Sequence, residues 1–162
     1  MKILIIQTGG TIDKDYPKTN NGYAFEVNEP AAKRILENAF PGFEYEIVSL
    51  FRKDSQKITR EDRDKLKSYL LNHPADKVLI THGSDTLIET AQFLGNISGK
   101  AIVLTGAFIP ERFTNSDAAF NIGVAIGALN QMHEGTFIAM NGMVFLTNRV
   151  EKNANTGMFE KQ

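Results

Sequence analysis

Short apolar runs, each closed by glycines, hydroxyls or charged residues, recur along the chain. The first run, residues 2–7, stops at Thr8-Gly9-Gly10-Thr11, and comparable runs occupy residues 45–50, 77–81 and 100–105. A continuous apolar run that ends at turn residues is typical of a strand buried on both faces, as in a parallel sheet. We therefore expect a sheet with residues 3–6 in its interior.

Helical patterns separate these runs. Asn28 can cap a helix whose first turn holds Pro30. Thr59 and Asp62 resemble a capping box, and the helix that follows should bury Leu66, Leu70 and Tyr69. The expected helices cover residues 28–39, 59–71, 87–94 and 116–132.

Asn141-Gly142 separates two further apolar runs near the end of the chain. This dipeptide is typical of a two-residue hairpin turn, because both of its positions need positive φ. Strands that alternate with helices indicate an α/β fold with right-handed crossovers. We predict a single-domain, mostly parallel sheet, Rossmann/flavodoxin-like, with helices on both faces and a C-terminal β-hairpin. Residues 13–28 read as a long loop and residues 147–162 as a polar tail.

Composition narrows the function classes. The chain has 162 residues, a formal charge of −1 and no cysteine, so we expect one domain and no thiolate metal site. A surface for nucleic acid needs basic residues, and none gather here. His73, His82 and His133 are scattered without metal-ligand spacing. No apolar run approaches the ~20 residues of a membrane span, and no signal peptide is visible, so we expect a cytoplasmic protein.

Two turns carry candidate chemistry. Thr11 follows the first strand, at the edge of an α/β sheet where ligands bind, although the spacing fits neither a dinucleotide fingerprint nor a P-loop. The alternative is a plain strand-ending turn. Ser84, Asp85 and Thr86 follow the third strand at a helix N-terminus, which suits a carboxylate ligand. The alternative there is that these three side chains only cap the helix.

Together the two turns resemble those of the bacterial asparaginase/glutaminase family. Thr8-Gly9-Gly10-Thr11-Ile12 is similar to the family's first turn, and His82-Gly83-Ser84-Asp85-Thr86 differs from its second turn only by Ser84 in place of threonine. Asn21-Gly22-Tyr23 resembles the mobile flap, and Asp54-Ser55-Gln56 the loop that grips the substrate. Gly106–Pro110 and Arg149–Lys152 are similar to two further segments, the latter supplying the catalytic lysine.

The sequence departs from the family in two other places. Lys57 stands where an acidic residue is usual. Family enzymes also continue into a smaller second domain that contributes to a neighbouring subunit's site, whereas this chain stops where the linker would begin. We therefore expect residues 1–162 to form a single asparaginase N-terminal-type domain.

The resemblance implies hydrolysis of L-asparagine, with glutamine as an open alternative, and no metal or cofactor. Thr11 would be the primary nucleophile and Thr86 the second hydroxyl, with Lys152 as the base, Asp85 as its partner and Tyr23 on the flap. Ser55 and Gln56, with Asp85 and Thr86, would bind the substrate. Without the resemblance, Lys152 reads as a solvated tail lysine and Tyr23 as a surface tyrosine.

Two other functions stay open at this stage. The chain could be a catalytically reduced protein that binds asparagine or aspartate, or an amidotransferase-like subunit that needs a partner. We also expect a homo-oligomer, since a domain without its covering domain should expose apolar surface. The helix at residues 116–132, which contains Gly123 and Gly127, is one candidate contact.

Overall fold

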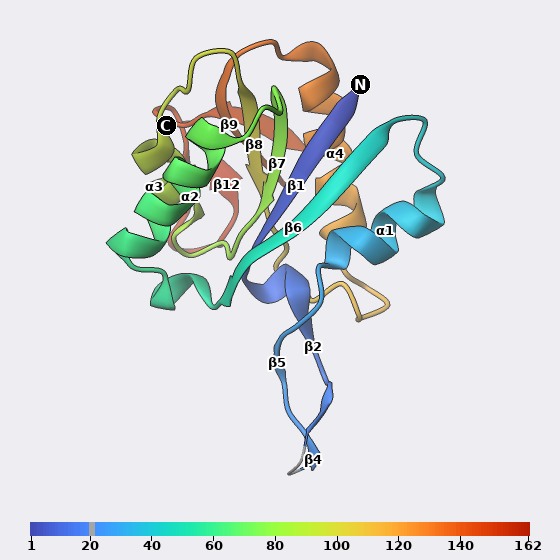
Figure 1. Ribbon diagram of the computed structural model, residues 1–162. Helices are drawn as coiled ribbons and strands as arrows, with labels where there is room; N and C mark the ends of the chain where they lie inside the picture. The colour runs from blue at the N-terminus through green and yellow to red at the C-terminus, as the bar shows by residue number, and fades with distance from the viewer. Residues whose placement is uncertain (20–21) are drawn as a thin grey trace.

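The computed structural model describes residues 1–19 and 22–162 (Figure 1). Its main sheet has the strand order β10-β9-β8-β7-β1-β6, parallel throughout except for β10, which runs antiparallel to β9. This confirms the predicted mostly parallel α/β fold with an antiparallel edge. The strands are β1 (Lys2–Gly9), β6 (Glu44–Lys53), β7 (Lys77–Thr81), β8 (Ala101–Thr105), β9 (Gly135–Met140) and β10 (Met143–Leu146).

Strand β1 lies inside the sheet, as the apolar run predicts. Ile5 pairs with Ile47 of β6 on one side and with Leu79 of β7 on the other. Side chains alternate between the faces of a strand. Leu4 and Ile6 therefore enter one apolar cluster, while Ile3 and Ile5 enter the other.

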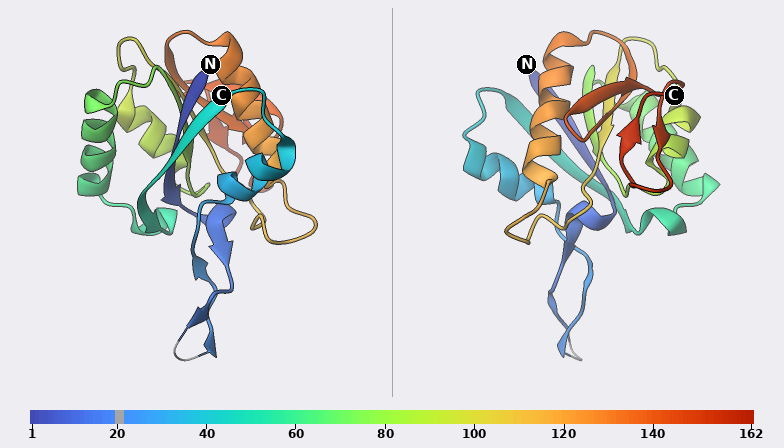
Figure 2. Two further views of the ribbon diagram at one scale, coloured as in Figure 1. Left: turned by 45° about the vertical axis from the view of Figure 1, so that its right-hand side comes forward. Right: turned by 180° about the vertical axis from the view of Figure 1, so that it is seen from behind.

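The helices cover both faces of the sheet (Figure 2). Helices α2 (Arg60–Asn72) and α3 (Leu87–Leu94) pack on the face of Leu4 and Ile6. Helices α1 (Ala31–Ala39) and α4 (Ala118–Gln131) pack on the opposite face. The described helices include none that is both long and apolar enough to cross a bilayer.

Of two predicted helix N-termini, one is confirmed and the other is wrong. Thr59 and Asp62 form the predicted capping box, and Leu66 and Leu70 are fully buried, with Tyr69 half-buried. The prediction that Asn28 caps α1 is wrong. Its N-cap is Pro30, and the backbone N–H of Ala31 donates to the Asp13 carboxylate at 2.7 Å.

The hairpin prediction is confirmed in detail. Asn141 and Gly142 have φ of 54° and 79°, and Met140 pairs with Met143 across the turn. Both turn residues thus take the left-handed conformation that a two-residue hairpin requires. Gly135, at φ 117°, begins β9.

Two segments expected to be irregular are folded. The long loop is an arm of paired short strands, β2 (Lys14–Asp15) with β5 (Glu26–Val27) and β3 (Lys18–Thr19) with β4 (Gly22–Tyr23). It projects from the edge of the sheet at which β1 ends (Figure 1). In the tail, β11 (Glu151–Lys152) pairs with β12 (Phe159–Glu160).

The tail is held by two apolar anchors that sequence analysis did not weigh. Val150 and Phe159 are each 4% exposed and belong to the cluster under α2 and α3. Figure 2 shows the tail lying on that face of the sheet. Lys152, next to these anchors, is thereby fixed close to the body of the protein.

Candidate active site

Glycines bring three loops into contact at the carboxyl ends of β1, β6 and β7. A Cβ on Gly10 would lie 2.3 Å from the Cα of Gly83, and a Cβ on Gly83 would lie 2.6 Å from the Cβ of Ser55. The N–H of Gly10 also donates to the carbonyl of Lys53 at 2.9 Å. Side chains larger than hydrogen would separate the turns, so glycine is required for their approach.

Thr11 opens a short 3₁₀ turn, Thr11–Asp13, directly after this contact and is half-buried. Within the described part of the chain, its hydroxyl makes no hydrogen bond, so it is available to a substrate. Tyr23 lies on the arm in β4, but its side chain falls outside what the structure describes, as does Asn21. The predicted role of Tyr23 therefore stays a prediction.

Lys152 reaches across from the tail to the second turn. Its ammonium donates to Asp85 Oδ1 at 2.8 Å and to Ser84 Oγ at 3.2 Å. Gln56 donates to the other oxygen of Asp85 at 2.8 Å. The bond from Lys152, followed by that from Gln56, holds the pKa of Asp85 below its ordinary value, so the carboxylate is ionised at neutral pH.

Thr86 lies in the same turn but faces another partner. Its hydroxyl donates to the carbonyl of Ser55 at 2.9 Å, and it makes no capping bond to α3 although it occupies the N-cap position. The hydroxyl beside Lys152 belongs to Ser84, which sequence analysis did not select. The signal was present, because Ser84 is the position at which the resembled motif carries threonine.

Two buried groups behind the turns were also missed. Asp13 is 0% exposed and accepts hydrogen bonds from Ala31 N and Thr81 Oγ1. Burial raises the pKa of Asp13 to about 7. His82 is likewise 0% exposed, and burial lowers the pKa of its ring to about 4. No sequence pattern marks Asp13, because its partners Ala31 and Thr81 lie 18 and 68 residues away. His82 opens the motif of the second turn, but the motif does not show that its ring is buried.

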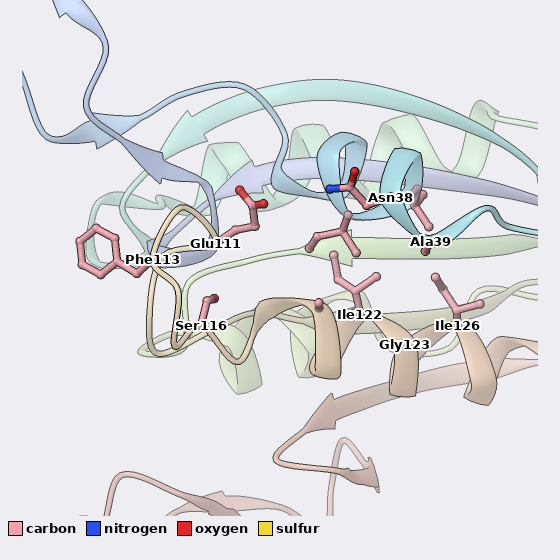
Figure 3. A pocket seen from close by; sticks show the side chains of 11 residues that line it. Asn38, Ala39, Glu111, Phe113, Ser116, Ile122, Gly123 and Ile126 are labelled. Carbon is pink, nitrogen blue, oxygen red and sulfur yellow. The ribbon is translucent and has the colours of Figure 1, made fainter.

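Among the hollows outside this cluster, two lie next to the arm or between helices. One, of about 340 Å³, separates the arm from the 3₁₀ turn Ser55–Lys57 and is lined in part by Lys14, Asp54 and Lys57. The other, of about 470 Å³, runs between α1 and α4 (Figure 3). Its walls are mainly apolar and hold none of the predicted site residues, so we do not assign it to the reaction.

The described residues show no group of three or more His, Cys, Asp or Glu side chains placed to hold a metal ion. The arrangement at the sheet edge instead combines a free hydroxyl, a lysine–carboxylate pair and turn N–H groups. These are the parts that nucleophilic attack on an amide carbonyl needs.

Comparison with known proteins identifies the family of this chain. Residues 2–160 match the protein family described as "Asparaginase, N-terminal". The L-asparaginase of Thermococcus kodakarensis is 30% identical, over 98% of this chain and 49% of that protein. A solved structure described as the thermostable L-asparaginase from Thermococcus kodakarensis superposes with a TM-score of 0.86, over 99% of this chain and 51% of the other.

Two further relatives agree. The glutaminase-asparaginase of Acinetobacter glutaminasificans is 25% identical, over 94% of this chain and 50% of that protein. A structure described as a probable cytoplasmic L-asparaginase from Campylobacter jejuni is 25% identical with a TM-score of 0.79, over 99% of this chain and 51% of the other. The chain thus spans about half the length of the curated relatives that it matches.

Proposed function

The chain belongs to the asparaginase family through its N-terminal domain, and we propose that it is an amidohydrolase that converts L-asparagine to L-aspartate and ammonia. The relatives named L-asparaginase and glutaminase-asparaginase support a side-chain amide as the substrate, asparagine or glutamine. The two differ by one methylene, which changes binding by only about 1–3 kcal/mol.

The observation that carries the proposal is the contact of Lys152 with both Ser84 and Asp85 beside the Thr11 turn. In the reaction, Thr11 Oγ1 attacks the amide carbon and its proton passes through Ser84 to Lys152. The C–N bond of the tetrahedral intermediate then breaks, and the departing amino group takes up that proton and leaves as ammonia. Water attacks the ester on Thr11, a proton of that water returns to Thr11 Oγ1, and aspartate is released.

The α-amino and α-carboxylate groups of the substrate are bound by residues of the turns that follow β6 and β7. Ser55 and Gln56 lie on the turn after β6, and Gln56 already contacts the carboxylate of Asp85. That carboxylate is suited to the substrate's ammonium, and the N–H groups of the two turns to its negative charges. Thr86 was predicted as the second catalytic hydroxyl, but its bond to Ser55 supports a role in joining these two loops.

The exposure of Asp85 and Lys152 to solvent lowers the rate of hydrolysis that we expect. The side chains of Asp85 and Lys152 are 45% and 28% exposed. Water near reacting groups weakens the electrostatic interactions that stabilise a transition state. We therefore expect residues 1–162 on their own to hydrolyse asparagine slowly.

Ammonia release from L-asparagine and L-glutamine by the purified chain tests the proposal. Thr11→Ala and Lys152→Met should each abolish it, because one removes the nucleophile and the other the base. Lys161→Met, on the exposed end of the tail, is the matched control and should keep the wild-type rate. Equal rates for wild type and Thr11→Ala would reject the catalytic assignment.

A binding protein for asparagine or aspartate is the second candidate, and the exposed Asp85 favours it. Calorimetric titration with L-aspartate distinguishes the amidohydrolase from the binding protein. Under the hydrolase proposal, Thr11→Ala binds aspartate nearly as wild type does, whereas Asp85→Ala binds it weakly. Binding without any ammonia release from the wild type would favour the second candidate.

We further propose a cytoplasmic location and self-association. The likeness to a structure described as a probable cytoplasmic L-asparaginase supports the first. Exposed aromatic side chains support the second, among them Phe40 at 89% and Phe120 at 61% exposure.

A further inference from the structure

A chain of buried polar side chains runs behind the second turn. His82 follows β7, Thr90 lies on α3 and Arg63 on α2, and they are 0%, 1% and 6% exposed. Arg63 Nε donates to Thr90 Oγ1 at 3.0 Å, and Thr90 Oγ1 lies 2.9 Å from His82 Nε2. At the outer end, Arg63 forms an ion pair of 2.9 Å with Glu89, whose side chain is 64% exposed.

The donors and acceptors of this chain determine where the histidine proton sits. A carbonyl oxygen only accepts, so Nδ1, which faces the Gly83 carbonyl, must donate there. In a neutral ring Nε2 then accepts the hydroxyl proton of Thr90, whose oxygen accepts from Arg63. The ring is neutral, because burial and the positive charge of Arg63 lower the pKa of His82 to about 4. Its proton is therefore on Nδ1, which donates to the carbonyl of Gly83 at 2.8 Å.

This bond orients the peptide between Gly83 and Ser84. The described peptides are all trans, and in a trans peptide the C=O and N–H point in opposite directions. With the Gly83 carbonyl directed at the buried ring, the N–H of Ser84 is directed to the other side. No acceptor for that N–H occurs within residues 1–19 and 22–162.

We infer that Arg63, Thr90 and His82 are positioning residues that aim the Ser84 N–H at the negative charge developing on the substrate's amide oxygen. The inference rests on the proposed amidohydrolase function and adds to it three residues outside the site. A backbone donor of this kind is effective only when its direction is set before the reaction. The buried ring sets that direction, since rotation of the peptide would break its bond to Nδ1.

The burial of Arg63 and His82 indicates that these polar side chains do more than fill space. Apolar side chains of similar volume would fill the gap between α2 and α3 without the cost of burying a guanidinium and an imidazole. The turn is also held from its other side, because a Cβ on Gly106 would lie 2.4 Å from the carbonyl oxygen of His82. That oxygen belongs to the preceding peptide, so both successive peptides of the turn are closely packed.

Two variants of His82 separate positioning from folding. In His82→Asn the side-chain N–H replaces Nδ1–H, so the bond to the Gly83 carbonyl can persist. In His82→Gln the amide reaches toward the Nε2 position, and that bond is lost. We expect His82→Asn to keep kcat within about tenfold, and His82→Gln to lose about 10²–10³ in kcat with little change in KM.

Thr90→Val tests the middle of the chain, because it keeps the shape of threonine and removes the oxygen. We expect it to lower kcat about tenfold or more at unchanged KM. Glu89→Gln is the matched control at the exposed end and should keep the wild-type kcat. Equal kcat for His82→Asn and His82→Gln, or a Thr90→Val enzyme with wild-type kcat and only a lower Tm, would overturn the inference.

Nitrogen NMR of the histidine rings supplies a readout that needs no activity. Wild type should show His82 protonated on Nδ1 only. A wild-type ring protonated on Nε2 would overturn the network even in an active enzyme. Absence of ammonia release by the wild type would instead reject the proposed function, whatever the tautomer.

Discussion

Asp13 is the residue at which burial and charge conflict most strongly. It is fully buried, two positions after the candidate nucleophile, and its carboxyl group joins the start of α1 to the end of β7. Its carbonyl accepts from Asn28 N at 2.9 Å, across the base of the arm. A single residue, through its side chain and its backbone carbonyl, thus links the Thr11 turn, the arm and a helix.

Replacement of Asp13 by asparagine should change how stability depends on pH. The pKa of about 7 in the folded protein exceeds the ordinary 3.8, so between these values the folded state holds a proton that the unfolded state has released. The free energy of unfolding of the wild type should therefore fall as the pH rises from 4 to 8. The loss should be a few kcal/mol, because each unit of pKa difference corresponds to about 1.36 kcal/mol. Urea unfolding of wild type and Asp13→Asn across this range measures the difference.

Asparagine is a suitable control for shape, because its amide oxygen can still accept from Ala31 N. The free energy of unfolding of Asp13→Asn should be nearly flat over the same range, apart from slopes that both proteins share. Two parallel pH profiles would show that Asp13 is ionised throughout.

Ser84 and Thr86 lie two residues apart and should respond differently to loss of their hydroxyls. Ser84→Ala removes the contact with Lys152, so we expect kcat to fall about 10²-fold with KM little changed. Thr86→Val removes the bond to Ser55, so we expect mainly a higher KM. Steady-state ammonia release measures both. A larger kcat loss in Thr86→Val than in Ser84→Ala would restore Thr86 as the catalytic hydroxyl.

At the scale of elements, the packing of the two turns depends on glycine. Gly10 has φ of 91°, and a Cβ there would lie 2.3 Å from the backbone of Gly83. Gly10→Ala should therefore destabilise the fold by about 3 kcal/mol or more, from strain and overpacking together. Thermal unfolding measures this cost, and ammonia release should be lost with it.

Gly127 provides the matched control on α4. It is exposed, and a Cβ there would have no neighbour within 4 Å. Gly127→Ala should stabilise the protein by about 0.5–1 kcal/mol, because alanine favours a helix over glycine. If Gly10→Ala and Gly127→Ala changed the free energy of unfolding by the same amount, the close contact of the two turns would not depend on glycine at position 10.

The arm is the element with the least support of its own, because isolated two-stranded ribbons are marginally stable. Tyr16 stacks on Phe25 at 4.7 Å between ring centroids, and Phe25 lies 6.4 Å from Phe113. Asp15 also forms an ion pair with Arg112 at 2.8 Å. The arm that carries Tyr23 is thus held by the loop after β8.

For the whole molecule, the face of α1 and α4 is the best candidate for contact with a second copy. The apolar groove of Figure 3 lies there, and Phe40, 89% exposed with φ of 48°, ends α1 beside it. We expect dimers or larger species by light scattering at high micromolar concentration, and fewer of them in Phe40→Asn. A purely monomeric wild type would refute self-association.

Asparagine is chosen at this position because it accepts the left-handed conformation more readily than phenylalanine. Phe40→Asn should therefore unfold at the wild-type temperature or slightly above it. A drop in association cannot then be ascribed to a weakened fold.

The sequence by itself determined the strands of the main sheet, the four helices and their order. Apolar runs such as residues 3–6, the Thr59–Asp62 capping box and the Asn141-Gly142 turn act through neighbours in the chain, so their pattern predicts β1, α2 and the hairpin correctly. The motifs after β1 and β7 also indicated the edge of the sheet at which we propose the site, and the family to which the chain belongs.

Only the tertiary structure decided how those elements meet. Asp13, and not Asn28, caps α1, and Ser84, and not Thr86, faces Lys152. The polar tail folds because Val150 and Phe159 find a cluster built by distant helices. In each case the partner lies far away in the chain, and burial and hydrogen-bond direction, which no local pattern encodes, select it.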